Sequence, residues 1–208
     1  MIPKILYVIL TCDKFSERRK LQEESWLKCI GEKDEVRYLD DKNVREDTYD
    51  NVPRKYSDFI REFPRFNEFD WVFFCDDDTF VFPKRLQHLL SYQDCSKPLM
   101  IGRTGVYEGY TYCSGGAGFV VSRVLMLQTK SYLHNQAFKH FTNSDTSFAR
   151  WAKEAVPNMG TLDRTEQFQT QHLRHDDNAL VDIDSCITFH YISEYDYNIL
   201  NKHLKFSL

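Results

Sequence analysis

The first half of the chain alternates short apolar runs with segments of helical periodicity. Three runs have the length and composition of buried strands: residues 4–10, 36–39 and 71–75. Three segments between and after them are predicted helices: residues 16–29, residues 53–64 and a segment that begins at Pro83. This β-α-β-α-β-α order predicts an α/β fold with a mostly parallel central sheet and helices on both faces. In such folds, ligands bind at the carboxyl ends of the strands.

The second half has a more mixed pattern. Strands are expected at residues 99–102, 119–122 and 187–191, and helices at residues 144–155 and at the C-terminus. Residues 163–178 are polar without a clean period, so we expect a mobile loop there, with His172 and His175 in solvent. No composition break marks a linker, and one domain over residues 1–208 is therefore expected.

Charge and composition exclude several classes of protein. The net charge of −4 argues against a nucleic-acid binder, which needs a basic surplus. No apolar run approaches the ~18 residues of a membrane helix, and the N-terminus does not have the pattern of a signal peptide. A cytoplasmic protein without a membrane span is expected. The six cysteines form no C-x-x-C pair, which argues against a zinc site and favours reduced, packed thiols.

The strongest chemical signal is the run Asp76-Asp77-Asp78 directly after the apolar strand at residues 71–75. Three adjacent carboxylates repel one another unless a cation lies among them, and carboxylate oxygens suit Mg²⁺ or Mn²⁺. Alternate residues such as Asp76 and Asp78 can converge on one side of an extended chain. The alternative is a solvated acidic turn that caps the helix beginning at Pro83.

Three weaker signals follow in the chain. Gly115-Gly116-Ala117-Gly118 lets the backbone approach a ligand closely, or forms a bulge or tight turn. Asp145, at a predicted helix start, is either a general base or a residue that complements the helix dipole. His190, near the end of a late strand, is either a metal ligand or a packed histidine.

These signals occur in an order that resembles the fringe-like, β-1,3-galactosyltransferase-type glycosyltransferases with a GT-A fold. The matching residues span nearly the whole chain: Thr11, Arg18, Trp26, Asp70-Trp71, Asp76-Asp77-Asp78, the glycines at 115–118, Asp145 and Phe189-His190. Within this family, the chain is most similar to glycosyltransferase domains of large algal-virus proteins. The resemblance implies a UDP-sugar donor, a glycan or glycoprotein acceptor, transfer of a hexosyl or deoxyhexosyl unit, and Mn²⁺ (or Mg²⁺) as cofactor.

The resemblance also implies a role for each matching position. Asp76, Asp78 and His190 are the implied metal ligands, and Asp145 is the implied base. The positions implied to contact the nucleotide or the sugars are Thr11, Asp13, Arg18, Asp40, Asp76, Asp77, Gly115 and Gly116. Residues 1–95 then form the nucleotide-sugar-binding half, and residues 96–208 the acceptor and catalytic half.

The chain departs from the family in two ways. Members usually carry two acidic residues at the helix start, but Ser144 precedes Asp145 here, so inversion and retention both stay open. Members commonly have a membrane anchor and a stem, which this chain lacks, so a cytosolic enzyme or a piece of a longer protein is expected. Two other functions remain open: a haloacid-dehalogenase-like phosphohydrolase using the Asp77-Asp78-Thr79 run, and a non-catalytic nucleotide- or sugar-binding module.

Overall fold

The centre of the molecule is a six-stranded sheet with the order β2-β1-β3-β8-β5-β9. The computed structural model describes residues 2–40, 48–136, 139–171, 173 and 182–204. The strands are β1 (Ile5–Leu10), β2 (Glu35–Leu39), β3 (Trp71–Asp76), β5 (Leu99–Gly102), β8 (Phe119–Ser122) and β9 (Gly160–Asp163). β8 runs antiparallel to β3 and β5, whereas the pairs β1–β2, β1–β3 and β5–β9 are parallel. The predicted mostly parallel sheet is therefore confirmed.

Alternation along the central strands divides the core between the two faces of the sheet. In β1, Tyr7 and Ile9 pack into one apolar cluster, while Leu6 and Val8 pack into the other, because successive strand residues point to opposite faces. All four side chains are at most 1% exposed. The sheet is thus covered on both sides, as the continuous apolar run predicts.

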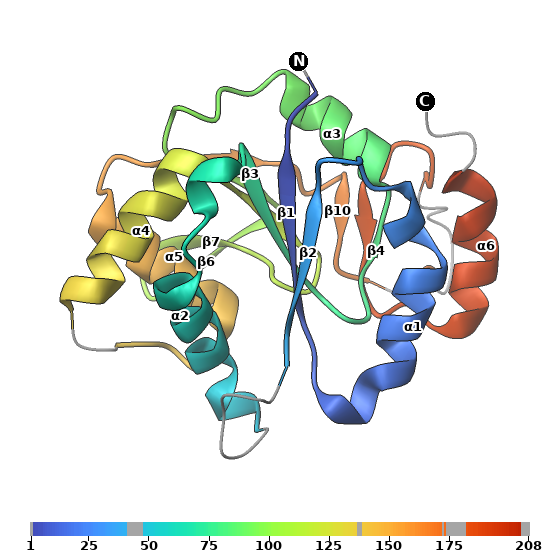
Figure 1. The fold of residues 1–208 in the computed structure, drawn as a ribbon, viewed down its shortest axis with the longest axis horizontal. Coiled ribbons are helices and arrows are strands. Elements are labelled where there is room, and N and C mark those ends of the chain that lie inside the picture. Colours follow the sequence, from blue (N-terminus) through green and yellow to red (C-terminus); the bar gives the residue numbers. More distant parts are fainter. Residues whose placement is uncertain (1, 41–47, 137–138, 172, 174–181, 205–208) are drawn as a thin grey trace.

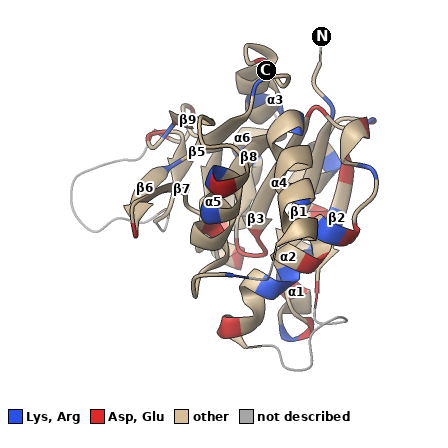
Figure 2. Ribbon diagram, turned by 90° about the vertical axis from the view of Figure 1, so that its left-hand side faces the viewer, with Lys and Arg blue, Asp and Glu red and all other residues tan. Residues whose placement is uncertain are grey.

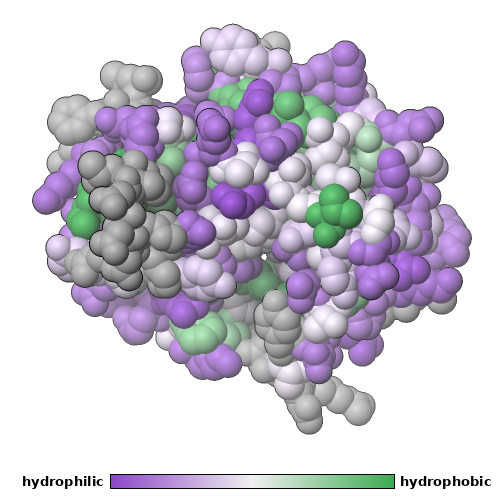
Figure 3. Space-filling model, turned by 180° about the vertical axis from the view of Figure 1, so that it is seen from behind, coloured by the Kyte–Doolittle hydropathy of each residue, from purple (hydrophilic) through white to green (hydrophobic). Residues whose placement is uncertain are grey.

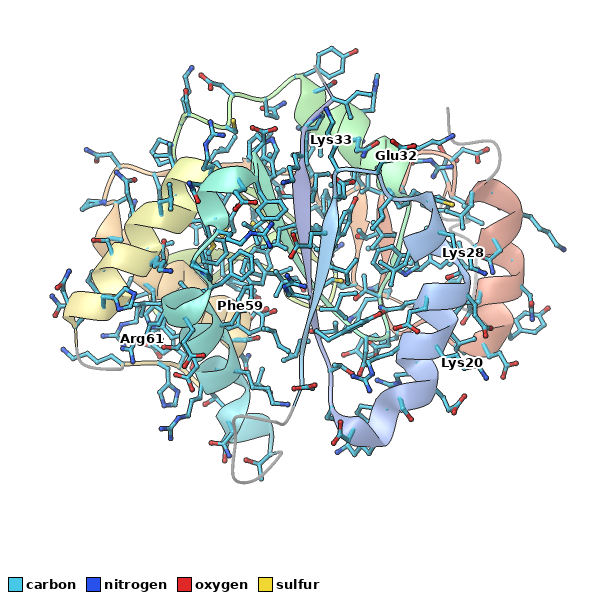
Figure 4. All side chains as sticks on the ribbon, in the orientation of Figure 1. Lys20, Lys28, Glu32, Lys33, Phe59 and Arg61 are labelled. Atoms are coloured by element: carbon cyan, nitrogen blue, oxygen red, sulfur yellow. The ribbon has the colours of Figure 1, made fainter. Side chains whose placement is uncertain are left out.

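Helices from both halves of the chain cover the two faces (Figure 1). One face carries α2 (Val52–Glu62), α4 (Arg123–Asn135) and α5 (Ser144–Ala155). The other carries α3 (Pro83–Ser91), α6 (Glu194–Leu204) and the short 3-10 helix Trp26–Cys29, which follows α1 (Ser16–Glu24). Arg61 of α2, labelled in Figure 4, donates a hydrogen bond to the Leu133 carbonyl (3.1 Å) and so ties α2 to the end of α4.

The helix predicted over residues 16–29 is wrong in its second part. Helix α1 ends at Glu24, Ser25 leaves helical geometry (φ −120°, ψ −108°), and a 3-10 helix follows from Trp26 to Cys29. The break places the Trp26 indole fully in the core, 5.9 Å from the Tyr7 ring between centroids. Burial of this large side chain thus overrides the continuous helical pattern.

A β-hairpin lies between the predicted strands at residues 99–102 and 119–122, where no element was predicted. Strands β6 (Thr104–Tyr107) and β7 (Tyr110–Cys113) pair antiparallel, and Glu108 (φ 50°) and Gly109 (φ 80°) form the turn between them. Two consecutive positive φ angles are typical of tight hairpin turns. Helix α4 and strand β9 have no counterpart among the predicted elements.

The late strand is shorter than predicted. Only Thr188–Phe189 (β11) is a strand, paired with β10 (Phe168–Gln169) on one side and β4 (Phe80–Val81) on the other. The expected loop over residues 163–178 therefore contains a strand, β10. The rest of that prediction, including His172 and His175, falls largely outside the described residues.

The surface carries mixed charge and scattered apolar residues. Lys or Arg and Asp or Glu both occur along helices α1 and α2 in Figure 2, which agrees with the small net charge. The face seen in Figure 3 is largely hydrophilic, and its apolar patches are small and separate. Within the described part of the chain, no helix is long and apolar enough to cross a membrane.

Candidate active site

A cleft of about 470 Å³ opens at the carboxyl ends of β1 and β3. It is lined by the end of β1 with the residues that follow, Arg18 of α1, the start of α2 with Thr48 before it, the acidic end of β3, Ser114–Gly116, the start of α5, and the residues after β11. These segments are far apart in sequence but meet here because parallel strands end at the same edge of a sheet. The cleft therefore collects most of the predicted site residues.

Asp76, Asp78 and His190 form a group that can hold a metal ion. One ligand atom from each lies within 4.8 Å of the others. The His190 Nε2 atom is 3.2 Å from Asp78 Oδ1 and 3.7 Å from Asp76 Oδ2. Two carboxylates and one imidazole suit Mn²⁺ well, since imidazole is a poor ligand for Mg²⁺. His190, which stands without a metal-site spacing partner in the sequence, thus lies directly beside the acidic motif.

The pKa values of the two proposed carboxylate ligands are shifted in opposite directions. Burial is the main cause that raises the pKa of Asp76; His190 acts to lower it, Asp78 and Asp145 act to raise it, and the resulting pKa is about 7. Burial also acts to raise the pKa of Asp78, but the hydrogen bond and charge of His190 outweigh it, and the pKa of Asp78 is lowered. A divalent cation would offset the repulsion among these carboxylates.

Asp77 points to a different side of the motif. Its carboxylate accepts hydrogen bonds from Thr11 Oγ1 (2.8 Å) and from Arg18 (3.0 Å), and Arg18 also contacts Asp78 at 3.2 Å. Burial still raises the pKa of Asp77 despite these two donors. Arg18 and Thr11 therefore hold the motif at the end of β3. The carboxylates of Asp76 and Asp78 face His190.

Gln22, which was not predicted as a site residue, and Thr79 fix the backbone of the acidic motif. Gln22 of α1, fully buried, donates its Nε2 hydrogen bonds to the carbonyls of Asp76 and Thr79, both at 3.2 Å. The Thr79 hydroxyl donates to the Gly116 carbonyl at 2.8 Å and accepts from the Asp76 N–H at 3.2 Å. Gln22 and Thr79 thus link the acidic motif to α1 and to the glycine segment.

The glycine segment connects the proposed base to the proposed metal ligands. Gly115 N–H donates to Asp145 Oδ2 at 2.9 Å, and Thr146 N–H donates to Oδ1 at 2.7 Å. Gly116 lies against the His190 ring so closely that a Cβ there would collide with it. Burial raises the pKa of Asp145 in spite of its two backbone hydrogen bonds, which makes this carboxylate a better proton acceptor than an ordinary aspartate.

Most predicted site residues lie in this cleft, but two do not. Thr11, Arg18, Asp76, Asp77, Asp78, Gly115, Gly116, Asp145 and His190 all line it. Asp13 is exposed at the start of the short 3-10 helix Asp13–Phe15 and is not among the lining residues, although Cys12 and Lys14 beside it are. Asp40 lines an adjoining hollow of about 290 Å³ at the end of β2. The roles of all these residues stay predictions.

Lys14, Lys55 and Tyr191 are among the lining residues that were not predicted from the sequence. Lys55 is only 6% exposed, lines both hollows, and donates to the Thr11 carbonyl at 3.1 Å. The sequence pattern places Lys55 on an otherwise apolar helix face. This could have marked it as a functional residue, because lysine is rarely buried without a partner. Tyr191 follows directly after His190, and no pattern in the sequence marks it as a site residue.

The fold is that of the GT-A glycosyltransferases. The chain matches a solved structure described as a glycosyltransferase involved in the glycosylation of the major capsid of PBCV-1, with a TM-score of 0.58, 15% identity, and coverage of 98% of this chain and 100% of that one. It also matches the bifunctional glycosyltransferase WbbM, with a TM-score of 0.55, 10% identity, and coverage of 98% and 50%. These likenesses establish the fold.

The chain belongs to the Fringe-like family, whose family model matches residues 2–150. It is 43% identical over 61 residues to a mouse (Mus musculus) β-1,3-glucosyltransferase, and 35% identical over 80 residues to glycoprotein-N-acetylgalactosamine 3-β-galactosyltransferase 1 of Xenopus laevis. These matches cover 27% and 38% of this chain, and only 12% and 22% of the respective relatives. The resemblance drawn from the motifs is confirmed at the level of family and fold.

Proposed function

We propose that the chain is a metal-dependent glycosyltransferase that moves a hexosyl or deoxyhexosyl unit from a UDP-sugar to a hydroxyl of a glycan or glycoprotein. The observation that carries this proposal is the cleft itself. It places the possible metal ligands Asp76, Asp78 and His190 opposite Asp145, with Gly115 and Gly116 between them. Family and fold support the same activity.

The donor set fits a divalent ion, with Mn²⁺ preferred over Mg²⁺ because of the imidazole of His190. When bound, such an ion would supply Lewis-acid stabilisation of the negative charge that grows on the leaving diphosphate. Three cationic side chains line the same cleft, Lys14, Arg18 and Lys55. Their charge favours the diphosphate of a donor over a neutral sugar.

In this proposal, the two halves of the chain supply different parts of the active site. Residues 1–95 supply the three cationic side chains and the acidic motif, and Asp40 lies in the adjoining hollow, where we expect the nucleoside. Residues 96–208 supply the glycine segment, Asp145 and His190. The six-stranded sheet holds both sets in one cleft, since β5, β8 and β9 of the second half join β1, β2 and β3 of the first.

Asp145 takes the proton in the proposed reaction. The bond from the sugar C1 to the diphosphate oxygen breaks, and its electron pair leaves with UDP. The acceptor oxygen forms the new bond to C1, and its proton passes to Asp145. A positioned general base contributes roughly 10²–10⁴-fold to such a step. Gly115 and Thr146 hold the carboxylate in place through their N–H groups, at 2.9 and 2.7 Å.

Incubation with a panel of UDP-sugars, Mn²⁺ and glycan acceptors tests the proposal, with UDP release and acceptor mass both recorded. A glycosyltransferase produces UDP together with an acceptor heavier by one sugar unit. Acceptor-independent release of inorganic phosphate would indicate a phosphohydrolase. Metal-dependent UDP binding without product from any pair would indicate a binding module. NMR of the product anomeric proton distinguishes inversion from retention.

A further inference from the structure

We infer that the ring of Tyr191 is a stacking platform for a pyranose of the acceptor, at the open rim of the cleft. The inference rests on the proposed function and assigns an acceptor-binding residue to it. Tyr191 lines the same cleft as the acidic motif and Asp145, and the residue is 50% exposed. Neighbouring His190 is only 8% exposed. The chain therefore turns from the cleft floor to its rim between these two residues.

The backbone at Tyr191 is in the left-handed region, with φ at 57°. A residue with a bulky side chain is a genuine outlier there, whereas glycine adopts this conformation freely. Hydrogen bonds on both sides hold the turn: His190 N–H donates to the Gln169 carbonyl (3.1 Å), and Ile192 N–H donates to the Asp78 carbonyl (3.0 Å). Glycine would satisfy this backbone best, so the tyrosine ring points to a function that the backbone alone does not need. Such outliers cluster at active sites and ligand clamps.

The orientation of the ring suits a sugar. It stacks on the His190 imidazole with centroids 3.7 Å apart and planes 29° from parallel. One face of the tyrosine thus covers the imidazole, while its exposed part borders the cleft. An aromatic side chain with an apolar face and a polar hydroxyl fits the apolar face and the hydroxyl edge of a pyranose.

The position favours the acceptor over the donor sugar. The donor is expected to lie deeper, between the metal ligands and Asp145, because its diphosphate shares the metal with them. Gly115, at the floor of that region, is buried, whereas Tyr191 is half exposed. The Tyr191 ring, at the open side of the cleft, is therefore placed to contact the acceptor, which enters from solvent. Aromatic residues are enriched where a few side chains carry most of the binding energy.

Tyr191→Gly is the decisive variant, because it removes the ring and relaxes the backbone at once. The full chain, saturated with UDP and Mn²⁺, is applied to an array of mono- and oligosaccharides, and its UDP affinity in Mn²⁺ is measured separately. We expect Tyr191→Gly to weaken glycan binding by at least about tenfold. UDP affinity should stay within about twofold of wild type, and the thermal midpoint should be equal or higher. Tyr191→Phe should keep glycan binding, because it keeps the ring face.

Tyr92→Gly is the matched control, since Tyr92 is 74% exposed and is not among the residues lining the cleft. It should bind glycans like wild type. Unchanged glycan binding by Tyr191→Gly would overturn the platform. So would a parallel loss of UDP affinity in Mn²⁺, because the ring would then act through His190. The UDP measurement on wild type tests the proposed function by itself, so failure of that function is distinguishable from failure of the platform.

Discussion

Gly116 and His190 are in such close contact that the imidazole occupies the space where a Cβ on Gly116 would lie. The Thr79 hydroxyl holds the Gly116 carbonyl at 2.8 Å, so the glycine has little room to retreat. Absence of a side chain at residue 116 is therefore a condition for the position of His190 beside Asp78. The glycine segment and the proposed metal site are one structural unit.

Gly116→Ala should displace the His190 ring and weaken Mn²⁺ binding by roughly tenfold or more, because one of the three ligands moves. Gly115→Ala is the matched control. A Cβ on Gly115 would meet Asp145 Cβ at 3.4 Å, an ordinary contact, so Mn²⁺ binding should persist. Isothermal titration with Mn²⁺ compares the two variants. Equal Mn²⁺ affinities of Gly116→Ala and Gly115→Ala would mean that Mn²⁺ binding does not depend on the position of the His190 ring.

Asp145→Asn should lower sugar transfer by roughly 10²-fold or more, because the amide cannot take the acceptor proton. Both carboxylate oxygens accept backbone N–H groups, and an amide can accept only one of them. We therefore expect a loss of stability of about 0.5–1.5 kcal/mol. UDP binding in Mn²⁺ should remain near wild type, which separates a role in the transition state from one in ground-state binding.

Near-normal transfer by Asp145→Asn, measured with the identified donor and acceptor, would contradict its role as the base. It would support a front-face reaction without an enzyme base. Thermal unfolding of the same preparation controls for the lost hydrogen bond. A stability loss without a rate loss would leave Asp145 as a residue that only orders the glycine segment and the start of α5.

The pH dependence of stability should reveal the raised pKa of Asp76. Burial raises this pKa to about 7, well above the ~3.9 of an unfolded aspartate. The protonated form is thus favoured in the folded protein, and its stabilisation is complete below about pH 4. It is lost as the pH rises through about 7. Metal-free wild type should therefore lose stability relative to Asp76→Asn between pH 4 and 7, by about 1 kcal/mol or more.

Thermal or urea unfolding in chelator, at several pH values, measures this difference. The amide in Asp76→Asn does not titrate, so the variant cancels the contributions of all other groups to first order. A constant difference between wild type and Asp76→Asn from pH 4 to 8 would contradict the shift. Added Mn²⁺ should reverse the order at pH 7, because the ionised carboxylate is the form that binds a metal.

Much of the site follows from the sequence because its residues lie at strand ends. Asp76–Asp78 directly follow an apolar strand, and the parallel-sheet pattern already places them at a ligand-binding edge. His190 could not be placed by its own surroundings in the sequence. It reaches the site only because β11 pairs with β4, the two-residue strand just after the acidic motif, and pairing between short distant strands leaves little trace in a local pattern.

Other elements could not be predicted because tertiary packing overrides local preference. Helix α1 ends before Trp26, because burial of the indole in the core is not compatible with a continuous helix there. Gln22 resembles a surface residue of a polar helix, yet it is fully buried against the carbonyls of the acidic motif. A polar side chain can be buried where it meets backbone groups that need a partner, and only the assembled structure shows that they are there.

Gln22→Met should remove the donor to both carbonyls at nearly constant volume. We expect a loss of about 1–3 kcal/mol, because the carbonyls of Asp76 and Thr79 would be left without this partner. Mn²⁺ affinity should fall as well, since the backbone that presents Asp76 would relax. Lys20→Met, on the exposed side of α1 (Figure 4), is the control and should change neither quantity. Chemical denaturation measures the stability and titration measures the Mn²⁺ affinity. Wild-type values of both for Gln22→Met would show that Gln22 does not hold the backbone of the acidic motif in place.

The most direct test of the account is the affinity for UDP with Mn²⁺ and with chelator, in wild type and in Asp78→Asn. We expect UDP to bind wild type at least about tenfold more tightly in Mn²⁺ than in chelator, because the carboxylates of the cleft repel a diphosphate until a cation bridges them. Asp78→Asn should remove most of that difference and stay folded. Equal UDP affinities of wild type in Mn²⁺ and in chelator would contradict the metal-dependent transferase proposed here.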